Sequence, residues 1–282
     1  MKDFQKRIDK AKELIRNADF VLIGAGAGLS TSAGFDYNGE TFNKYFADFK
    51  QKYGITDMYS GGFYPFKTEE EKWAFWSRMV YVNRYKSNAN DLYVRLFNLI
   101  KDKDYFVITT NVDHQFQLAG FDKKRLFYTQ GDYGLFQCSV PCHSKTYDNK
   151  DLIFKMVKEQ KDMKIPTSLI PKCPVCGRPM EMNLRADDRF VQDDGWYEHA
   201  KLYREFLEKS QNKNLVLVEI GVGYNTPAII KYPFERMTLL NKKTTLIRIN
   251  KDYAICEKEI KDRTVLFDED VKLIISNLEQ EI

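Results

Sequence analysis

Residues 19–34, DFVLIGAGAGLSTSAG, decide the fold of this chain. The apolar run over 19–24 predicts a β-strand, and the glycines and small hydroxyl residues after it predict a turn into a helix. Gly24, Gly26 and Gly28 would let the backbone approach a pyrophosphate at the start of that helix. The dinucleotide fingerprint is imperfect, because position 29 is leucine and no strand ending in an acid follows about 20 residues later. This motif alone leaves nucleotide binding and a merely tight strand–helix turn both open.

Apolar strands and amphipathic helices alternate along the rest of the chain. Further strands are predicted at 104–109, 125–128, 214–220 and 244–249, and helices at 4–17, 196–209 and 268–279. This alternation is typical of a parallel β-sheet with helices on both faces, so the predicted fold class is α/β.

Two segments interrupt the pattern and look like insertions. Residues 40–85 are rich in aromatic side chains, which predicts a helical module with a small aromatic core that covers the glycine-rich loop. An aromatic surface for a partner is the alternative. The second segment carries paired cysteines, so a smaller, discontinuous domain built from both segments is expected. The expected boundaries are 1–39, 86–137 and 190–282 for the sheet domain, 40–85 for the helical module and 138–189 for the cysteine module.

The composition is that of an ordinary globular protein. Of 282 residues, 43% are hydrophobic and 30% are charged, and the net charge is +4. So small a charge, without a dense Lys/Arg patch, argues against nucleic acid as a partner. The longest apolar runs are too short to cross a membrane, and residues 4–17 lack the features of a signal peptide. We therefore expect a cytoplasmic protein without membrane contact, whose cysteines are metal ligands or reactive thiols rather than disulfides.

Four cysteines form two close pairs, in CSVPC and CPVCG: Cys138, Cys142, Cys173 and Cys176. The two-residue spacing of the second pair is typical of a zinc knuckle. Four thiolates leave no open coordination position, so the predicted zinc is structural and not catalytic. His143 could replace one ligand, and four unligated thiols are the plain alternative. Cys256, beyond the last predicted strand, is expected to pack in the core.

Polar residues follow several predicted strands at the sheet edge where α/β proteins bind ligands. Asn111 and Asp113 in TTNVDHQF could orient an amide and a ribose hydroxyl, but loop and helix-cap roles are equally open. The adjacent His114 is expected to be a partly exposed loop residue. Later strand ends offer Gly221, Gly223, Asn225, Thr226 and Asn250. Their convergence on one edge indicates a binding site more strongly than any single motif does.

Together these pieces resemble the sirtuin family over essentially the whole chain. GAGLSTSAG at 26–34 resembles the sirtuin loop G-A-G-x-S-x-x-S-G, and TTNVD at 109–113 resembles T-Q-N-x-D. QG at 130–131 falls where the family has H-G, and GVGYNTP and RIN resemble its adenosine-side motifs. The resemblance implies a Rossmann-like large domain, a small zinc-bearing domain with a helical module, and NAD as co-substrate. Sirtuins cleave the nicotinamide–ribose bond of NAD, and ADP-ribose passes to a nucleophile.

The resemblance also implies roles for residues of this chain. Asn111 and Asp113 would orient nicotinamide and its ribose, and Gln130 would position that ribose, so these three are the expected catalytic residues. The remaining residues expected to bind the cofactor are Gly24, Ala25, Gly26, Ala27, Gly28, Ser30, Gly221, Val222, Gly223, Asn225 and Asn250.

Three departures separate this chain from deacylating sirtuins. Those enzymes carry I-P-D-F-R after the glycine loop, F-G-E after the zinc cysteines and a histidine as general base. At the corresponding places this chain has FDYNGETF, MNLRADD and Gln130. Glutamine can hydrogen-bond a ribose but cannot take its proton at any useful pH. Losing a general base typically costs ~10²–10⁴-fold in rate. Deacylation should therefore be weak or absent, whereas direct transfer to an acceptor that supplies its own nucleophile tolerates the loss.

The same departures resemble the macrodomain-linked bacterial sirtuins of class M, which are protein mono-ADP-ribosyltransferases. This likeness implies a lipoylated carrier protein similar to the glycine-cleavage H protein as acceptor, a macrodomain hydrolase that reverses the modification, and a role in oxidative stress. Two other functions stay open: an NAD-dependent lysine deacylase with an unusual acyl preference, and a catalytically silent sensor of NAD or ADP-ribose.

Overall fold

The computed structural model describes residues 2–279, which fall into two compact units. The first unit comprises the residues up to Gly34, Ala89–Gln130 and the residues from Gly195; the second comprises Phe35–Asn88 and Gly131–Asp194. The aromatic-rich and cysteine-bearing segments therefore fold together in one unit. Their division into separate modules with the boundaries given above stays a prediction.

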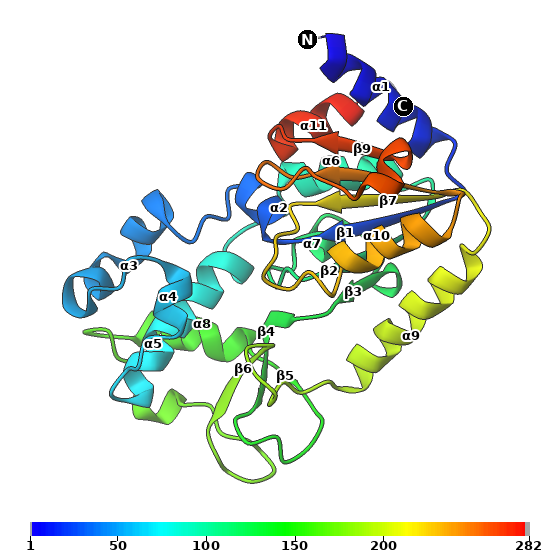
Figure 1. Ribbon diagram of the computed structural model, residues 1–282. Coiled ribbons are helices and arrows are strands. Elements are labelled where there is room, and N and C mark those ends of the chain that lie inside the picture. The colour runs from blue at the N-terminus through cyan, green and yellow to red at the C-terminus, as the bar shows by residue number, and fades with distance from the viewer. Residues whose placement is uncertain (1, 280–282) are drawn as a thin grey trace. The chain divides into compact units, whose positions relative to one another are not determined.

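A six-stranded parallel sheet forms the centre of the first unit (Figure 1). Its strand order is β3-β2-β1-β7-β8-β9. The central strands are buried almost throughout, which explains why they appear in the sequence as continuous apolar runs. The strands are β1 (Phe20–Ala25), β2 (Asp104–Thr109), β3 (Leu126–Tyr128), β7 (Leu215–Ile220), β8 (Thr244–Ile249) and β9 (Thr264–Phe267).

Helices cover both faces of this sheet, which confirms the predicted fold class (Figure 1). On one face, helices α9 and α10 pack on the sheet through a core that includes Leu22, Phe206 and Phe234. Helices α1, α6 and α11 lie together on the other face. The helices are α1 (Lys2–Arg16), α2 (Ala27–Ser32), α6 (Asp91–Ile100), α7 (Gln115–Leu118), α9 (Asp194–Lys209), α10 (Lys231–Leu240) and α11 (Val271–Glu279), with 3₁₀ turns η2 (Lys123–Arg125) and η4 (Lys258–Arg263).

Four of these helices are predicted from the sequence, whereas α6, the four-residue α7 and α10 are not. Asn90 caps α6 by accepting the N–H of Leu92, but the helix has only ten residues and follows directly on the aromatic segment. Helix α10 contains Pro233 and places charged side chains, Lys231 and Glu235, toward the sheet. Inward charges remove the apolar periodicity by which a helix is recognised.

The second unit combines a small antiparallel sheet with helices. The sheet order is β5-β4-β6, and the Lys-rich stretch between the cysteine pairs contains helix α8. The elements are α3 (Gly39–Tyr53), α4 (Met58–Gly62), α5 (Glu69–Val80), the π-helical turn η1 (Tyr81–Tyr85), β4 (Gly131–Cys138), β5 (Tyr147–Asp148), α8 (Lys150–Glu159), η3 (Thr167–Leu169) and β6 (Met180–Leu184).

Aromatic side chains form a core within the second unit, as the sequence predicts. The Phe46, Phe49 and Phe75 rings are fully buried and lie 4.9–6.2 Å apart, centroid to centroid. Phe66 extends the cluster at 5.7 Å from Phe75. Pairs at these distances each add about 0.5–1.5 kcal/mol beyond their burial. The aromatic residues of 40–85 therefore stabilise the second unit.

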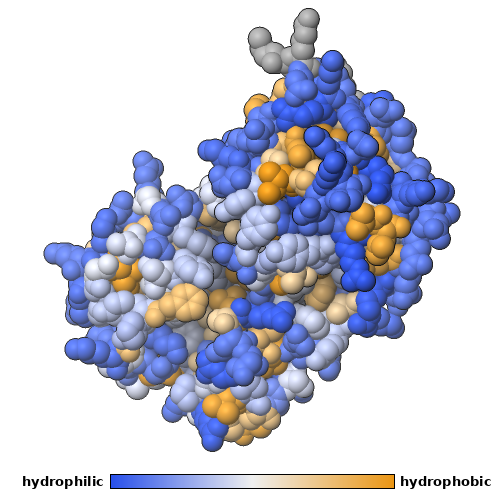
Figure 2. All heavy atoms as spheres, viewed as in Figure 1, coloured by the Kyte–Doolittle hydropathy of each residue, from blue (hydrophilic) through white to orange (hydrophobic). Residues whose placement is uncertain are grey.

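The face shown in Figure 2 is mostly hydrophilic, with hydrophobic residues in small separate patches. Among the helices of residues 2–279, none is both long and apolar enough to cross a bilayer.

Gly131, the glycine of the QG motif, should be irreplaceable for packing reasons alone. Its φ is +93°, and a Cβ added there would lie 1.9 Å from the Asn183 carbonyl oxygen on β6. Left-handed strain and overpacking together predict that Gly131→Ala destabilises the protein by about 3 kcal/mol or more. Urea denaturation of the variant measures this loss.

Gly54→Ala is the matched control. Gly54 lies in the same unit with φ +69°, but no atom lies within 4 Å of its added Cβ. Only the left-handed strain applies, about 1–2 kcal/mol. Equal losses of unfolding free energy in the two variants would contradict a clash between the added Cβ at Gly131 and the Asn183 carbonyl.

Candidate active site and zinc centre

The loops that follow β1 and β7 meet through glycine backbones. The Gly28 N–H donates to the Gly221 carbonyl at 3.0 Å. A Cβ on Gly26 would lie 2.7 Å from the Gly221 oxygen, and one on Gly28 would lie 2.6 Å from the Gly221 Cα. Gly221 has a φ of +60°. No side chain fits at these three positions, so contact between the two loops is sufficient to explain the glycines.

Gly24 has a separate structural reason. It lies inside β1 and faces α10, where an added Cβ would be 2.4 Å from Ile230 and 2.6 Å from Phe234. Gly24 therefore makes room for α10. Its neighbour Ala25 ends β1 and is buried, whereas Ala27 opens α2 and is exposed.

Asn111 reaches from the end of β2 to the loop after β1. Its Nδ2 donates to the Gly26 carbonyl at 3.0 Å and lies 3.5 Å from the Tyr93 hydroxyl. Its backbone N–H donates to Thr109 Oγ1 at 3.0 Å, and the residue is only 9% exposed. Because both side-chain hydrogens face protein acceptors, the Oδ1 carbonyl oxygen is the atom left for a ligand.

The Asp113 carboxylate is the centre of a buried hydrogen-bond network. Ser30 Oγ donates to its Oδ2 at 2.6 Å, and the Tyr93 hydroxyl donates to the same oxygen at 3.3 Å. The Gln115 backbone N–H donates to Oδ1 at 3.0 Å. The sequence correctly places Asn111 and Asp113 after the strand β2, and the structure brings them together with Ser30 of α2 around the Tyr93 hydroxyl.

Tyr93 is the site residue that sequence reasoning missed. It is fully buried on α6, and its ring packs edge-on against Phe116 at 5.0 Å. Burial raises the pKa of the Tyr93 phenol well above its ordinary value, and the nearby Asp113 carboxylate raises it further. The phenol thus keeps its proton and remains a donor. No local motif marks it, because its partners Ser30 and Asp113 lie 63 and 20 positions away in the sequence.

Gln130 lies at the same sheet edge, two residues beyond the end of β3. The preceding residue, Thr129, is fixed to β2 because both its N–H and its hydroxyl donate to the Thr109 carbonyl, at 3.0 and 3.1 Å. Gln130 itself is half-buried. His114 is also half-buried, as expected for a loop residue, and has a left-handed φ of 65°.

Asn250 joins the loops that follow β7 and β8. Its Nδ2 donates to the Val222 carbonyl at 2.9 Å, while its Oδ1 accepts the N–H groups of Asp252 and Tyr253 at 3.1 and 3.0 Å. One amide hydrogen of Asn250 remains for a ligand. Of the other predicted residues in the β7 loop, Gly223 is half-buried and Asn225 is exposed.

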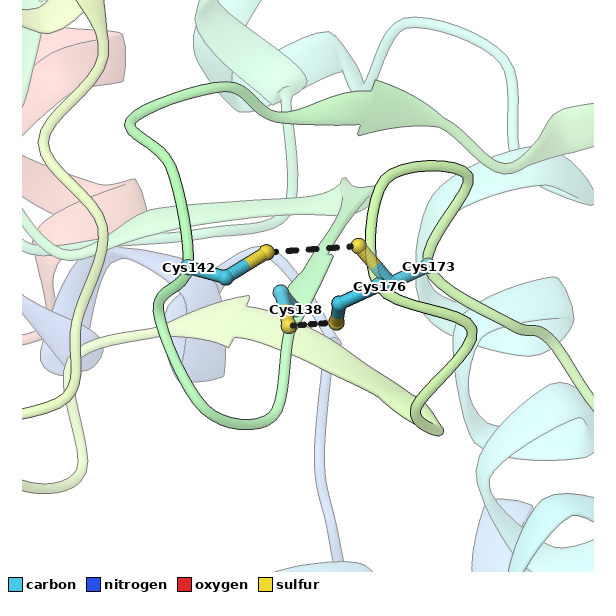
Figure 3. A group of neighbouring side chains, drawn as sticks. All are labelled: Cys138, Cys142, Cys173 and Cys176. Atoms are coloured by element: carbon cyan, nitrogen blue, oxygen red, sulfur yellow. Dashed lines mark hydrogen bonds between the residues drawn. The ribbon is translucent and has the colours of Figure 1, made fainter.

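The four paired cysteines converge in the second unit, with their sulfur atoms directed toward one another (Figure 3). Cys138 and Cys176 lie 3.6 Å apart, sulfur to sulfur, and Cys142 and Cys173 lie 3.7 Å apart. Tetrahedral zinc with Zn–S bonds of about 2.3 Å requires sulfurs about 3.8 Å apart. The residues therefore fit a closed, structural zinc ion.

The environment favours the thiolate form of Cys173, whereas burial and the neighbouring cysteines raise the pKa of the Cys142 thiol. Although burial opposes ionisation of the Cys173 thiol, hydrogen bonds from the Cys176 and Val175 backbone lower its pKa to about 7. His143 is outside the group of sulfurs: its Nδ1 lies 3.0 Å from Cys142 Sγ, and its Nε2 lies 2.8 Å from the Tyr147 hydroxyl. This geometry suits a hydrogen bond to a ligand sulfur.

Comparison with solved structures identifies the fold of this chain. The structure of Sir2Tm bound to a propionylated peptide has a TM-score of 0.60 at 20% identity and covers 97% of this chain and 98% of its own. A Sir2 complex with a p53 peptide and NAD+ has a TM-score of 0.57 at 18% identity, and the match covers 97% of this chain and 98% of the Sir2 chain. These likenesses show the fold. No protein-family model matches the chain.

Curated relatives then show the family. A "Protein ADP-ribosyltransferase" of Staphylococcus aureus (strain Mu50 / ATCC 700699) is 40% identical over 277 residues, 98% of this chain and 88% of the relative. The chain therefore belongs to the sirtuin family of NAD-dependent enzymes. Its place within the family is with the protein ADP-ribosyltransferases.

Two further relatives mark the range of activities in the family. A "Probable bifunctional ADP-ribose hydrolase/ADP-ribosyltransferase" of Fusarium oxysporum f. sp. cubense is 31% identical over 260 residues, 87% of this chain and 42% of that protein. An "NAD-dependent protein deacetylase" of Clostridium perfringens (strain 13 / Type A) is 30% identical over 258 residues, which are 88% of this chain and 93% of that protein. Identity is thus higher with the Staphylococcus transferase than with this deacetylase.

Zinc content should depend on Cys173 and not on Cys256. Cys173→Ser removes one of four ligands, so bound zinc should fall from about one ion per chain to nearly none, with loss of stability. Cys256→Ser is the control, because Cys256 is half-buried and packs against the core of the first unit, as predicted. Elemental analysis and thermal unfolding measure both variants. Full zinc retention in Cys173→Ser would contradict the four-cysteine site.

Tyr93→Phe should alter the alkaline stability of the protein. The unfolded phenol loses its proton near pH 10, whereas the folded one retains it, so its contribution to stability is complete below about pH 10 and falls as the pH rises further. The variant should therefore lose stability less steeply than the wild type above about pH 10. Identical slopes in urea denaturation from pH 8 to 11 would show that Tyr93 titrates normally.

Proposed function

We propose that this protein is a mono-ADP-ribosyltransferase that transfers ADP-ribose from NAD to a protein side chain. The observation that carries the proposal is the glutamine at 130, on the sheet edge that also holds Asn111 and Asp113. The 40% identity to a protein ADP-ribosyltransferase supports the same reaction class. At this sheet edge the Gln130 amide stands where a general base would be needed for deacylation. Such a site suits transfer of ADP-ribose to an acceptor that supplies its own nucleophile.

The nicotinamide half of NAD would lie against the network around Asp113. Asn111 presents a carbonyl oxygen that can accept an N–H of the carboxamide or a ribose hydroxyl. Asp113 and Ser30 would fix this arrangement, and Gln130 would hydrogen-bond the ribose. The glycosidic carbon–nitrogen bond breaks and nicotinamide leaves with the electron pair. The acceptor nucleophile bonds to the same ribose carbon and releases its proton to water.

The other half of NAD would bind along the loops after β1, β7 and β8. The backbone from Gly24 to Gly28 would hold the pyrophosphate. The adenosine would lie against the loop from Gly221 to Asn225, where the free amide hydrogen of Asn250 is available. Every residue in these roles belongs to the first unit.

We further propose a lipoylated carrier protein, similar to the glycine-cleavage H protein, as the acceptor in a cytoplasmic response to oxidative stress. The likeness to class M sirtuins supports this choice. A relative that combines an ADP-ribose hydrolase with an ADP-ribosyltransferase supports a macrodomain hydrolase as the partner that reverses the modification.

A deacylase is the second candidate, and the 30% identity to an NAD-dependent protein deacetylase favours it. It requires proton removal from a ribose hydroxyl, which Gln130 cannot perform. A silent sensor of NAD would bind the nucleotide without releasing nicotinamide.

One experiment separates these functions. The protein is incubated with labelled NAD, an acyl-lysine peptide and a lipoylated carrier, and the label is located. A transferase labels the carrier, a deacylase forms O-acyl-ADP-ribose, and a sensor releases no nicotinamide. Label on the peptide-derived product alone would overturn the proposal.

Asn111→Ala and Gln130→Ala should each lower ADP-ribose transfer by about 100-fold or more while thermal unfolding stays near that of the wild type. Both residues contact the reacting half of NAD in the proposed arrangement. Asn225→Ala is a milder comparison, because this exposed side chain would touch only the adenosine half. Unchanged labelling in both Asn111→Ala and Gln130→Ala would refute the assignment.

Gln130→His tests the link between this position and the reaction. A histidine here supplies the missing base, so O-acyl-ADP-ribose formation from acyl-lysine peptides should rise above the wild-type level. The matched Gln130→Asn variant keeps an amide and should show no such rise.

A further inference from the structure

Four charged side chains are buried together beneath the loops after β7 and β8, and the proposed reaction does not use them. Glu219, Lys231 and Arg248 have no exposed surface, and the Glu235 side chain is 19% exposed. Lys231 Nζ donates to Glu219 at 2.9 Å; Arg248 donates to Glu219 at 2.7 Å and to Glu235 at 2.8 Å. We call these four residues the buried charge network.

Strand register and helix spacing bring the network together. Glu219 on β7 pairs in register with Arg248 on β8, so both side chains emerge on the face that α10 covers. Lys231 and Glu235 are one helical turn apart on α10 and therefore face the same strip of sheet. The two acids and two bases balance in charge.

Stability alone is a weak reason for this arrangement. Moving charges out of water is costly, and well-packed apolar residues of similar volume often give an equally stable or more stable protein. Neighbouring positions on the same face of the sheet, such as Leu217 and Leu246, are apolar. The other reason for a buried network is fixed geometry, which directed hydrogen bonds between charged groups can impose.

The network contacts both loops. Lys231 begins α10 directly after the β7 loop, and its Nζ lies 5.2 Å from the centre of the Tyr224 ring in that loop. Arg248 Nη1 donates to the Ile255 carbonyl in the β8 loop. Glu219 therefore links the two loops through its two cationic partners.

The outer ends of the loops meet in an aromatic pair. The Tyr224 and Tyr253 rings lie 5.0 Å apart, nearly perpendicular at 87°. They are 44% and 41% exposed. Between this pair and the network, Asn250 fixes the backbone of Val222 and Tyr253. The shape of this exposed aromatic edge thus depends on the buried charges beneath it.

We propose that the buried charge network is a positioning device that holds the β7 and β8 loops, with Tyr224 and Tyr253 at their tips, in the shape that binds the adenine nucleotide half of NAD. This inference rests on the proposed function for the choice of ligand. Its residues act through the loops, so they should influence nucleotide binding and leave the bond-breaking step unchanged.

Binding of ADP-ribose to the full chain tests the proposal, measured by calorimetry without acceptor. Glu219→Gln and Glu235→Gln should each raise the Kd for ADP-ribose about tenfold or more, because each weakens a charge-assisted contact that shapes the loops. In the transfer assay, KM for NAD should rise while kcat at saturating NAD stays close to wild type.

Glu269→Gln is the matched control. Glu269 also belongs to the first unit and also pairs with an arginine, Arg7, at 2.5 Å, but that pair joins α1 to the segment before α11 and contacts neither loop. It should lower thermal stability somewhat and leave the Kd for ADP-ribose unchanged. A positioning role requires the network variants to differ from this control in Kd.

The outcomes separate the inference from the proposed function. If Glu219→Gln does not fold, Glu235→Gln decides, because Glu235 is partly exposed and bonds only one of the two cations. Lower melting temperature with unchanged Kd in Glu235→Gln would overturn the positioning role. A wild type that binds ADP-ribose but labels no acceptor would overturn the proposed transfer reaction, and the Kd comparison would still test the network.

Discussion

The close approach of two glycine-lined loops is the constraint on which the rest of the site depends. β1 and β7 are neighbouring parallel strands, so the chain leaves both at the same edge of the sheet. A Cβ on Gly26 or Gly28 would enter the Gly221 backbone, which means that only glycine lets these loops touch. Their contact fixes the start of α2, and hence Ser30, and it presents the Gly26 carbonyl to Asn111. The glycine motif therefore organises the site through the backbone before any ligand is considered.

The chemistry of the site follows from hydrogen-bond donors and acceptors that hold fixed protonation states. Gln130 and Asn111 do not titrate, and Tyr93 stays protonated because burial raises the pKa of its phenol. The Asp113 carboxyl group accepts hydrogen bonds from Ser30, Tyr93 and the Gln115 backbone, which fix its orientation. Such an arrangement can bind and orient a nicotinamide riboside group. It suits a reaction in which the acceptor supplies the nucleophile and no enzyme base removes its proton.

Much of this arrangement could be predicted from the sequence, and two of the exceptions, α10 and Tyr93, share a cause. Buried parallel strands appear in the sequence as apolar runs, and paired cysteines predict a metal cluster by their spacing, so β1, β2, β3, β7, β8 and the cysteine cluster were predicted. The short edge strand β9, in which burial alternates, was not. Helix α10 was missed because Lys231 and Glu235 face inward, where a pattern-based prediction requires apolar residues. Tyr93 was missed because tyrosine on a short amphipathic helix is ordinarily a core residue. In each case the polar group is satisfied by a partner that is distant in the chain.

The sequence by itself determined the parallel sheet, the glycine loop, the four zinc ligands and the replacement of a histidine base by Gln130, because each is a local property of residue type and spacing. The tertiary structure decided which atoms remain free to bind a ligand: the Oδ1 of Asn111 and one amide hydrogen of Asn250. It also decided that Gly24 accommodates a helix and that Glu219 joins two loops through Lys231 and Arg248. Whether a polar atom is free to bind a ligand depends on the residues that surround it in the folded chain. A local sequence pattern does not show which residues these are.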